Sequence, residues 1–253
     1  MTLAGLLGEP AAIWGFARSL MIYLGRPGRA AAERRFYRQF VGPGDLVFDI
    51  GAHVGNRSRS LQALGARVVA VEPQPRFAAW LDWLFRAQPQ VTVHRCALSA
   101  QAGSARLALS RRHPTLATLD RSWQSQVAMV PGFSHVRWES DLEVPVETLD
   151  RLIARHGMPA FCKIDVEGHE AEVLSGLSAA LPALSFEYTP GVPETAFACI
   201  GRLERLGRYR YAASPGETLE LGAWSDAGEL RAWLAARERS ECSGDIYALL
   251  EGP

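Results

Sequence analysis

The chain has 253 residues, of which 48% are hydrophobic and 21% charged, a composition typical of a globular protein with a sizeable core. Its formal net charge is zero, so it lacks the basic excess of most nucleic-acid binders, and no nucleic-acid partner is expected. Its four cysteines lie far apart, with no CxxC pair and no histidines at zinc-ligand spacing, which predicts reduced thiols in a cytoplasmic protein.

Residues 1–40 are expected to form a helical extension, because apolar residues recur at helical spacing on both sides of a GRPG break. The most hydrophobic stretch, 11–24, is interrupted by Arg18 and is too short to cross a bilayer, so no membrane span is expected. A packed helix is the favoured interpretation. The aromatic and basic residues from Trp14 to Phe40 leave two alternatives open, a membrane-surface role and a homodimer interface.

From residue 41 short apolar runs alternate with amphipathic helices, which predicts one α/β domain over 41–253. The expected strands are 46–50, 67–72, 91–98, 105–109, 142–146, 161–166, 183–188, 209–212 and 245–250, and the expected helices are 57–64, 76–86, 149–156, 170–177, 195–206 and 227–236. This order favours a doubly wound, mostly parallel sheet. An inserted segment at about 104–147 interrupts it, and 110–141 is expected to be a long irregular segment.

A glycine loop follows the first expected strand, where doubly wound sheets bind their ligands. Gly51 would let the backbone turn tightly next to a ligand, and Gly55 would let the following helix start close to the strand. Their G-x-x-x-G spacing differs from the G-x-G-x-x-G that presents amides to a pyrophosphate. The Asp49 carboxylate would repel a pyrophosphate but attract an ammonium or a sulfonium, which favours S-adenosylmethionine over NAD.

Glu72 ends the second expected strand, where an acid can accept hydrogen bonds from both hydroxyls of a ribose. The third strand ends near Ala97, which would then lie close to the adenine. The residues expected to bind the cofactor are Asp49, Gly51, His53, Gly55, Asn56, Glu72 and Ala97. For His53, cofactor contact or packing is favoured over proton transfer.

Six sequence pieces follow one another in a specific order: FDIGAHVGN, VVAVEP, CALS, VPVETLD, KIDVEGHEAEVLSGL and LSFEY. In this order and spacing, over residues 41–190, the chain resembles the FkbM family of methyltransferases. The resemblance implies a class I methyltransferase (Rossmann-like) fold, a seven-stranded sheet with one antiparallel edge strand. It also implies methyl transfer from S-adenosylmethionine, with S-adenosylhomocysteine as product, most often to a hydroxyl oxygen of a sugar or natural product.

By motif match, the resemblance implies that Asp165, Glu167 and His169 form a signature at the boundary between cofactor and substrate. Where the family often has an asparagine before its ALS segment, this chain has Arg95 and Cys96, so no side-chain contact with adenine carries over there.

Transfer to an alcohol needs a base for the hydroxyl proton, and His169 is the natural candidate because a neutral imidazole accepts protons near neutral pH. Asp165 would orient that imidazole or bind the substrate, and Glu187 would line the same pocket, so these three are the catalytic candidates. For Glu167 a role as helix cap has equal standing. Lys163 is expected to pair with a buried acid. No metal is assigned, because the two carboxylates of Asp165 and Glu187 are a thin ligand set.

The acceptor is expected to be a small molecule or a glycoside, and its pocket lies in the least interpretable part of the chain. Two alternatives stay open: N-methylation on the same scaffold, and a cofactor-binding or interaction protein without catalytic activity.

Overall fold

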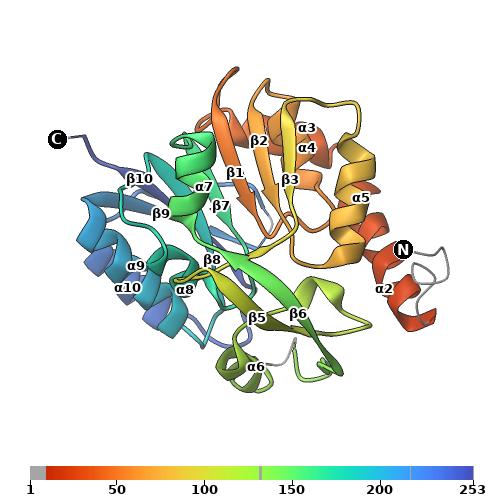
Figure 1. Cartoon of the computed structure of the whole chain (residues 1–253). Helices are drawn as coiled ribbons and strands as arrows, with labels where there is room; N and C mark the ends of the chain where they lie inside the picture. Colours follow the sequence, from red (N-terminus) through yellow and green to blue (C-terminus); the bar gives the residue numbers. More distant parts are fainter. Residues whose placement is uncertain (1–9, 131–132, 217, 253) are drawn as a thin grey trace.

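A computed structural model describes residues 10–130, 133–216 and 218–252 (Figure 1). Its centre is a seven-stranded sheet in the order β3-β2-β1-β7-β8-β10-β9. The strands are β1 (Leu46–Ile50), β2 (Arg67–Val71), β3 (Val91–His94), β7 (Phe161–Ile164), β8 (Ala183–Tyr188), β9 (Tyr209–Pro215) and β10 (Gly244–Leu250). Strands β3, β2, β1, β7 and β8 pair in parallel with their neighbours. Strand β10 runs antiparallel to both β8 and β9. This is a class I methyltransferase fold whose antiparallel strand lies second from the edge, and the expected edge position is wrong.

Helices cover both faces of the sheet, as the alternating sequence pattern predicts (Figure 1). They are α2 (Pro10–Leu24), α3 (Arg29–Tyr37), α4 (Asn56–Gln62), α5 (Pro75–Phe85), α7 (Leu149–His156), α8 (Glu170–Ser175), α9 (Glu194–Leu206) and α10 (Ala227–Ala235). Every residue of β1 and β7 is buried, because parallel strands in the middle of such a sheet contact helices on both sides.

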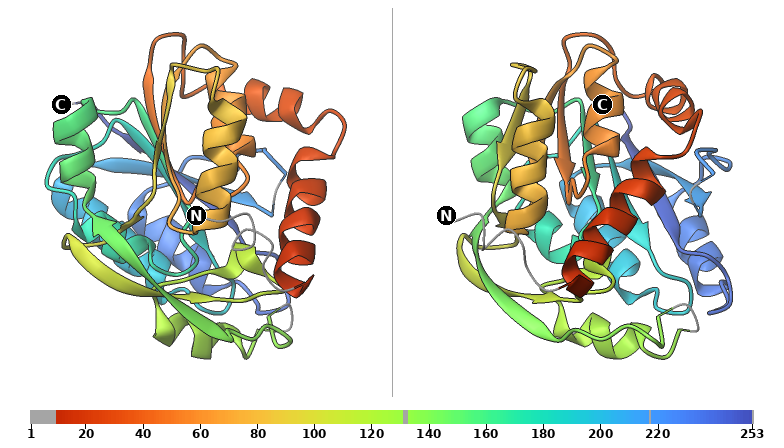
Figure 2. Two further views of the ribbon diagram at one scale, coloured as in Figure 1. Left: turned by 45° about the vertical axis from the view of Figure 1, so that its right-hand side comes forward. Right: turned by 90° about the vertical axis from the view of Figure 1, so that its right-hand side faces the viewer.

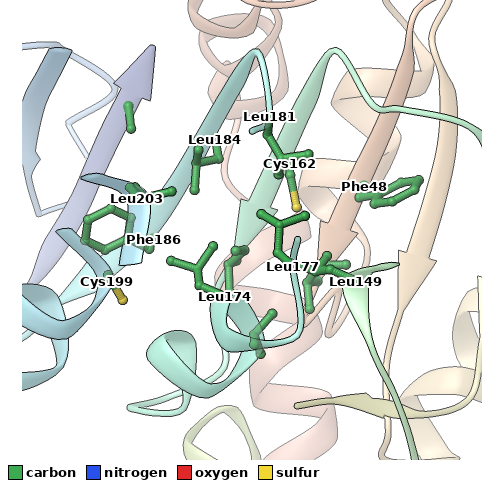
Figure 3. Packing of buried hydrophobic residues seen from close by; sticks show 14 of the residues in the cluster. Phe48, Leu149, Cys162, Leu174, Leu177, Leu181, Leu184, Phe186, Cys199 and Leu203 are labelled. Atoms are coloured by element: carbon green, nitrogen blue, oxygen red, sulfur yellow. The ribbon is translucent and has the colours of Figure 1, made fainter. Parts of the chain in front are cut away.

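The larger core lies between the sheet and the helices α7 to α10. Figure 3 shows Leu174 and Leu203 from these helices packed against Leu184 and Phe186 of β8. A second core on the other face joins Phe36 and neighbouring side chains of the α3 region to the sheet. The two cores hold the carboxyl ends of β1, β2, β7 and β8 in fixed positions, and the functional residues follow these ends.

The inserted segment forms a separate three-stranded sheet, in the order β4-β6-β5. Its strands are β4 (Ala97–Leu98), β5 (Gly103–Leu109) and β6 (Ser140–Glu147). The single strand expected over 91–98 is therefore wrong. The chain leaves the central sheet after His94, and Ala97 and Leu98 pair with β6. The buried Ala97 side chain packs on the apolar face of the insertion, whereas Leu98 belongs to the larger core.

The segment 110–141 is also more ordered than expected. It contains the short 3₁₀ helix η1 (Pro114–Leu116) and the helix α6 (Arg121–Val127). The Asp120 carboxylate caps α6 by accepting hydrogen bonds from the backbone amides of its first turn.

The N-terminal helices α2 and α3 confirm the expected extension over the described residues, and residues 1–9 of that expectation lie outside them. Helix α2 packs through Phe16 on Phe77 of α5, with ring centroids 5.2 Å apart. Its Gly15 lies so close to the backbone of Arg111 that a methyl group there would meet the carbonyl oxygen at 2.6 Å. Among the described residues, no helix combines the length and the apolar character needed to cross a membrane.

Candidate functional site

Two adjoining cavities open at the carboxyl ends of the central strands. The first, here called the apolar cavity, is lined on one side by Ile50, Val71, Glu72, Cys96, Ala97, Leu98, Leu107 and His169. The second, here called the acidic cavity, is lined by residues that include Asp49, Lys163, Glu187 and Asp245. The two cavities share a wall formed by Gly51, His53, Thr115, Asp165 and Glu167. The first expected loop and the expected signature after β7 therefore meet between them.

The loop after β1 confirms the need for glycine at position 51. Gly51 has a φ of +81°, and a Cβ there would lie 1.9 Å from the backbone oxygen of Asp165. The Gly51 and Ala52 amides donate to the Val71 carbonyl oxygen at 2.9 and 3.0 Å, which ties the loop to β2. The backbone can therefore pass close to a ligand in the apolar cavity.

Glu72 is buried at the end of β2 and holds the same loop. One carboxylate oxygen accepts from the His53 amide at 2.9 Å, and the other accepts from the Gln74 amide at 2.8 Å. Burial raises the pKa of Glu72 to about 7. Each oxygen keeps a free lone pair, which is what two ribose hydroxyls need.

His53 adopts a left-handed backbone with a φ of +48°. Its ring packs between Phe77 and Tyr23, with centroids 4.2 and 5.4 Å away. Burial lowers its pKa to about 4, so the imidazole is neutral at pH 7. Its Nε2 atom is buried and has no hydrogen-bond partner among the described residues, which leaves it free for a polar atom of a ligand. The unpaired Nε2, the Glu72 carboxylate and the apolar wall together fit an adenosine.

The other residues expected to bind the cofactor do not all lie in the same cavity. Ala97 lines the apolar cavity, whereas Asp49 and Asn56 line the acidic one. Gly55 lines neither, and a Cβ there would meet Leu81 of α5 at 2.6 Å. Gly55 is thus a helix-packing residue in this structure.

Lys163 and Asp165 form an ion pair at the end of β7, which confirms the expected pairing of Lys163 with an acid. The Lys163 ammonium is buried and donates to Asp165 Oδ2 at 2.5 Å. Burial alone would raise the pKa of Asp165, but the attraction of the Lys163 charge outweighs it, and the pKa is lowered. Asp165 is therefore ionised at neutral pH.

Glu167 and Glu187 complete a group of three carboxylates with Asp165, whose oxygens lie within 4.8 Å of one another. Among the described residues, neither glutamate has a hydrogen bond or ion pair. Burial raises the pKa of both carboxyls, and the charge of Asp165 raises them further. No metal was expected because Asp165 and Glu187 alone supply only two carboxylates. The structure adds Glu167 to them as a third possible oxygen ligand.

The cap interpretation of Glu167 is wrong. The Glu170 carboxylate accepts instead from the Val166 and Gly168 amides, at 3.0 and 3.2 Å. Glu167 has a φ of +55°, an unusual backbone for a residue with a side chain. The tight turn directs its carboxyl to the wall between the two cavities.

His169 lines the apolar cavity, and its Nε2 lies 3.0 Å from the Ser99 hydroxyl. Burial lowers the pKa of the imidazole, which keeps it neutral. The structure thus brings Asp165 and Glu187 together in the acidic cavity and places His169 on the other side of the shared wall. Ser99 is the last residue of the CALS piece, whose strand end was expected near the adenine, and its contact with His169 was not expected.

The inserted segment supplies part of both walls. Thr115 of η1 lines both cavities. Its neighbours are held by two hydrogen bonds to backbone oxygens: Gln74 Nε2 donates to Pro114 at 2.9 Å, and Trp138 Nε1 donates to Leu116 at 2.7 Å.

The acidic cavity is rich in carboxyl groups, and the raised pKa values of Glu167 and Glu187 favour the neutral form of those two in the free protein. Its five carboxylates are Asp49, Asp165, Glu167, Glu187 and Asp245. Against them stand Lys163 and Arg57, and Arg57 is paired with Glu33 outside the cavity lining. Such a cavity favours a cation, which lowers the pKa of its carboxyls, over an anion, which raises it.

Comparison with known proteins points to a family of methyltransferases. A family model described as a methyltransferase FkbM domain matches residues 49–240. The hexuronic acid methyltransferase AglP of Haloferax volcanii is 28% identical over 145 residues, which are 56% of this chain and 54% of that protein. The 31-O-demethyl-FK506 methyltransferase FkbM of Streptomyces tacrolimicus is 31% identical over 161 residues, which are 53% of this chain and 60% of that protein.

The chain thus spans little more than half the length of the curated relatives it matches. Among solved structures, the precorrin-6y C5,15-methyltransferase of Geobacter metallireducens is 12% identical, with a TM-score of 0.44 over 88% of this chain and 87% of that chain.

Proposed function

From the premise that this chain belongs to the FkbM family of methyltransferases, we propose that it methylates a hydroxyl oxygen of a sugar or natural product. S-adenosylmethionine is the cofactor, and when bound it supplies a methyl group already activated by positive sulfur. The observation that carries the proposal is the acidic cavity, in which two unpaired carboxyls lie next to a cavity that fits adenosine.

The apolar cavity would hold the cofactor. Glu72 would accept hydrogen bonds from the ribose hydroxyls, and Ala97 with its apolar neighbours would contact the adenine. Gly51 leaves room for the ligand at the turn. The carboxylates of the adjoining cavity would attract the positive charge of the cofactor.

The acidic cavity would hold the acceptor and take its proton. Asp165, Glu187 and His169 remain the proposed catalytic residues, and the geometry favours Glu187 as the base, with Glu167 beside it. In that role the Glu187 carboxylate would accept the hydroxyl proton as the acceptor oxygen takes the methyl group, and the electron pair of the broken carbon–sulfur bond would stay on the sulfur of the cofactor. A positioned base of this kind contributes about 10²–10⁴-fold to the rate.

The charge of the acidic cavity also bears on the class of acceptor. An anionic acceptor such as a hexuronic acid would be repelled by the carboxylates, so a neutral or amine-bearing acceptor is favoured. The same lining supports a second candidate, N-methylation, because an ammonium-bearing acceptor is attracted to it.

The test incubates the full chain with S-adenosylmethionine and a panel of neutral sugars, amino sugars, uronic acids and hydroxylated natural products. Formation of S-adenosylhomocysteine identifies the acceptor, and the ¹³C shift of the transferred methyl group separates O-methyl from N-methyl products. Glu187→Gln should lower turnover about 10²–10⁴-fold but keep cofactor binding, whereas Asp82→Asn, at an exposed surface ion pair, should change neither. Turnover of uronic acids alone would contradict the proposed acceptor class.

A further inference from the structure

Helix α2 exposes a row of large apolar side chains. Trp14 and Met21 are 63% and 68% exposed, and Ile13 next to them is 42% exposed. Trp14 and Met21 are two helical turns apart, so they lie on one side of the helix. Arg18 is exposed on the same side. Of the six exposed large hydrophobic residues in the described part of the chain, three are therefore on this helix.

This row is not the side by which α2 packs on the domain. The inner side contacts α5 through Phe16, whose ring lies 5.2 Å from Phe77 and 6.0 Å from Trp80. Trp80 in turn stacks on Trp83, which is 54% exposed. Both views in Figure 2 place α2 on the outside of the molecule. Ile13, Trp14 and Met21 are here called the exposed patch.

Positive charge gathers in the same part of a chain that is neutral as a whole. Residues 10–40 contain six arginines and one acid, Glu33. Glu33 is buried and is held by Arg29, Arg57 and Ser60, so it does not offset the exposed charge. The N-terminal helices therefore present tryptophan, methionine and arginine to solvent without an exposed carboxylate among the described residues.

We propose that α2 is a docking helix for a bilayer surface that contains anionic phospholipids. Aromatic and aliphatic side chains on one side of a helix, with arginines beside them, are typical of helices that lie in the plane of a membrane. Arginine is attracted to anionic headgroups, while its aliphatic stem and the indole ring sit at the headgroup level. Tyr23 on the inner side of α2 lines the acidic cavity, so a docked helix would hold that cavity close to the bilayer. The proposal does not depend on the methyl acceptor.

Co-sedimentation of the full chain tests the proposal, with vesicles of phosphatidylcholine alone and of phosphatidylcholine mixed with phosphatidylglycerol. The chain should bind only the mixed vesicles, and added salt should release it. Trp14→Ser and Met21→Ser should each weaken binding about tenfold, because each removes apolar area buried in the headgroup region. Met129→Ser is the matched control, since Met129 is 61% exposed on the inserted segment and should keep full binding.

Charge is tested separately with Arg18→Gln, which should weaken binding roughly fivefold, since one arginine near an anionic surface contributes about that factor. Arg208→Gln is its control, because Arg208 is exposed next to the edge strand β9. If the wild-type chain does not sediment with the mixed vesicles at low salt, the proposal is overturned. A homodimer in light scattering that the Trp14 and Met21 variants dissociate would also overturn it, because the patch would then be a self-association surface. Thermal stabilisation by S-adenosylhomocysteine should persist in every variant, so a failure here is distinct from a failure of the methyltransferase proposal.

Discussion

Lys163 is the position where the electrostatics of the site can be tested without knowledge of the acceptor. Its side chain is 2% exposed and bonds to Asp165. Burial raises the pKa of the nearby Asp49 carboxyl, and the Lys163 charge offsets part of that rise. Lys163→Met keeps a similar shape but removes the buried charge, so Asp165 is left as an uncompensated carboxylate beside Glu167.

The cost follows from the burial of the two partners. Breaking a fully buried ion pair by removing one partner costs about 3–5 kcal/mol. The Asp165 side chain is 37% exposed, and solvent screening reduces the penalty to roughly 2–3 kcal/mol. In the wild-type chain the pKa of Asp165 is lowered, so the pair stabilises the fold above the unfolded pKa of about 3.9 and is lost as pH falls. In the variant, burial raises that pKa instead, and the deficit should shrink as pH falls from about 7 to about 4.

Urea unfolding followed by tryptophan fluorescence measures this deficit at each pH. The double variant Lys163→Met with Asp165→Asn should recover part of the lost stability at pH 7, because it removes the unpaired charge. The resulting double-mutant cycle should give a favourable coupling of about 2 kcal/mol. A Lys163→Met variant less than 1 kcal/mol weaker at pH 7, or equally weak at every pH, would refute this account of the ion pair.

Three further predictions use the same protein. Glu72→Gln should weaken S-adenosylhomocysteine binding about tenfold in calorimetry; because the pKa of Glu72 is about 7, wild-type affinity should fall below that pH, and a flat pH profile would contradict the ribose assignment. Gly55→Ala should destabilise the fold by about 1–3 kcal/mol through the contact with Leu81, with unchanged ligand affinity once folded. Glu187→Gln should lower kcat about 10²–10⁴-fold with little change in cofactor binding; the same loss in His169→Asn instead would assign the base to the imidazole.

Much of the central sheet was predictable because each parallel strand is a short apolar run between polar helix surfaces. The strands over 46–50 and 183–188 and the helix over 149–156 have the predicted bounds. The single strand expected over 91–98 was wrong because a continuous apolar run does not show where the chain changes its pairing from β2 to β6. Ala97 and Leu98 join a strand more than forty residues away in sequence, and local periodicity carries no sign of that pairing.

In the candidate site, too, the residues set by local sequence were predictable, and those set by long-range folding were not. Glu72 and Asp165 were predictable because each ends or follows a strand at the edge where such folds bind ligands. Gly55 lines neither cavity and packs against Leu81, because a glycine needed for helix packing looks the same in sequence as one needed by a ligand. Thr115 was missed because its place in the walls of both cavities depends on how the inserted segment folds against the central sheet.

The charges of the two cavities predict that cofactor binding prepares the base. Lys163 pairs with Asp165, and neither Glu167 nor Glu187 has an ion pair with it. The raised pKa values of these two carboxyls therefore favour their protonated forms in the free protein. A cationic ligand beside the shared wall lowers the pKa of both carboxyls, and they should release protons when S-adenosylmethionine binds. S-adenosylhomocysteine lacks the sulfonium charge and should release fewer. Calorimetric titration in two buffers of different ionisation enthalpy counts the released protons, and Glu187→Gln should remove most of the difference between the ligands. If both ligands release the same number of protons, the carboxyls do not respond to the cofactor charge. The assignment of Glu187 as the base would then be refuted.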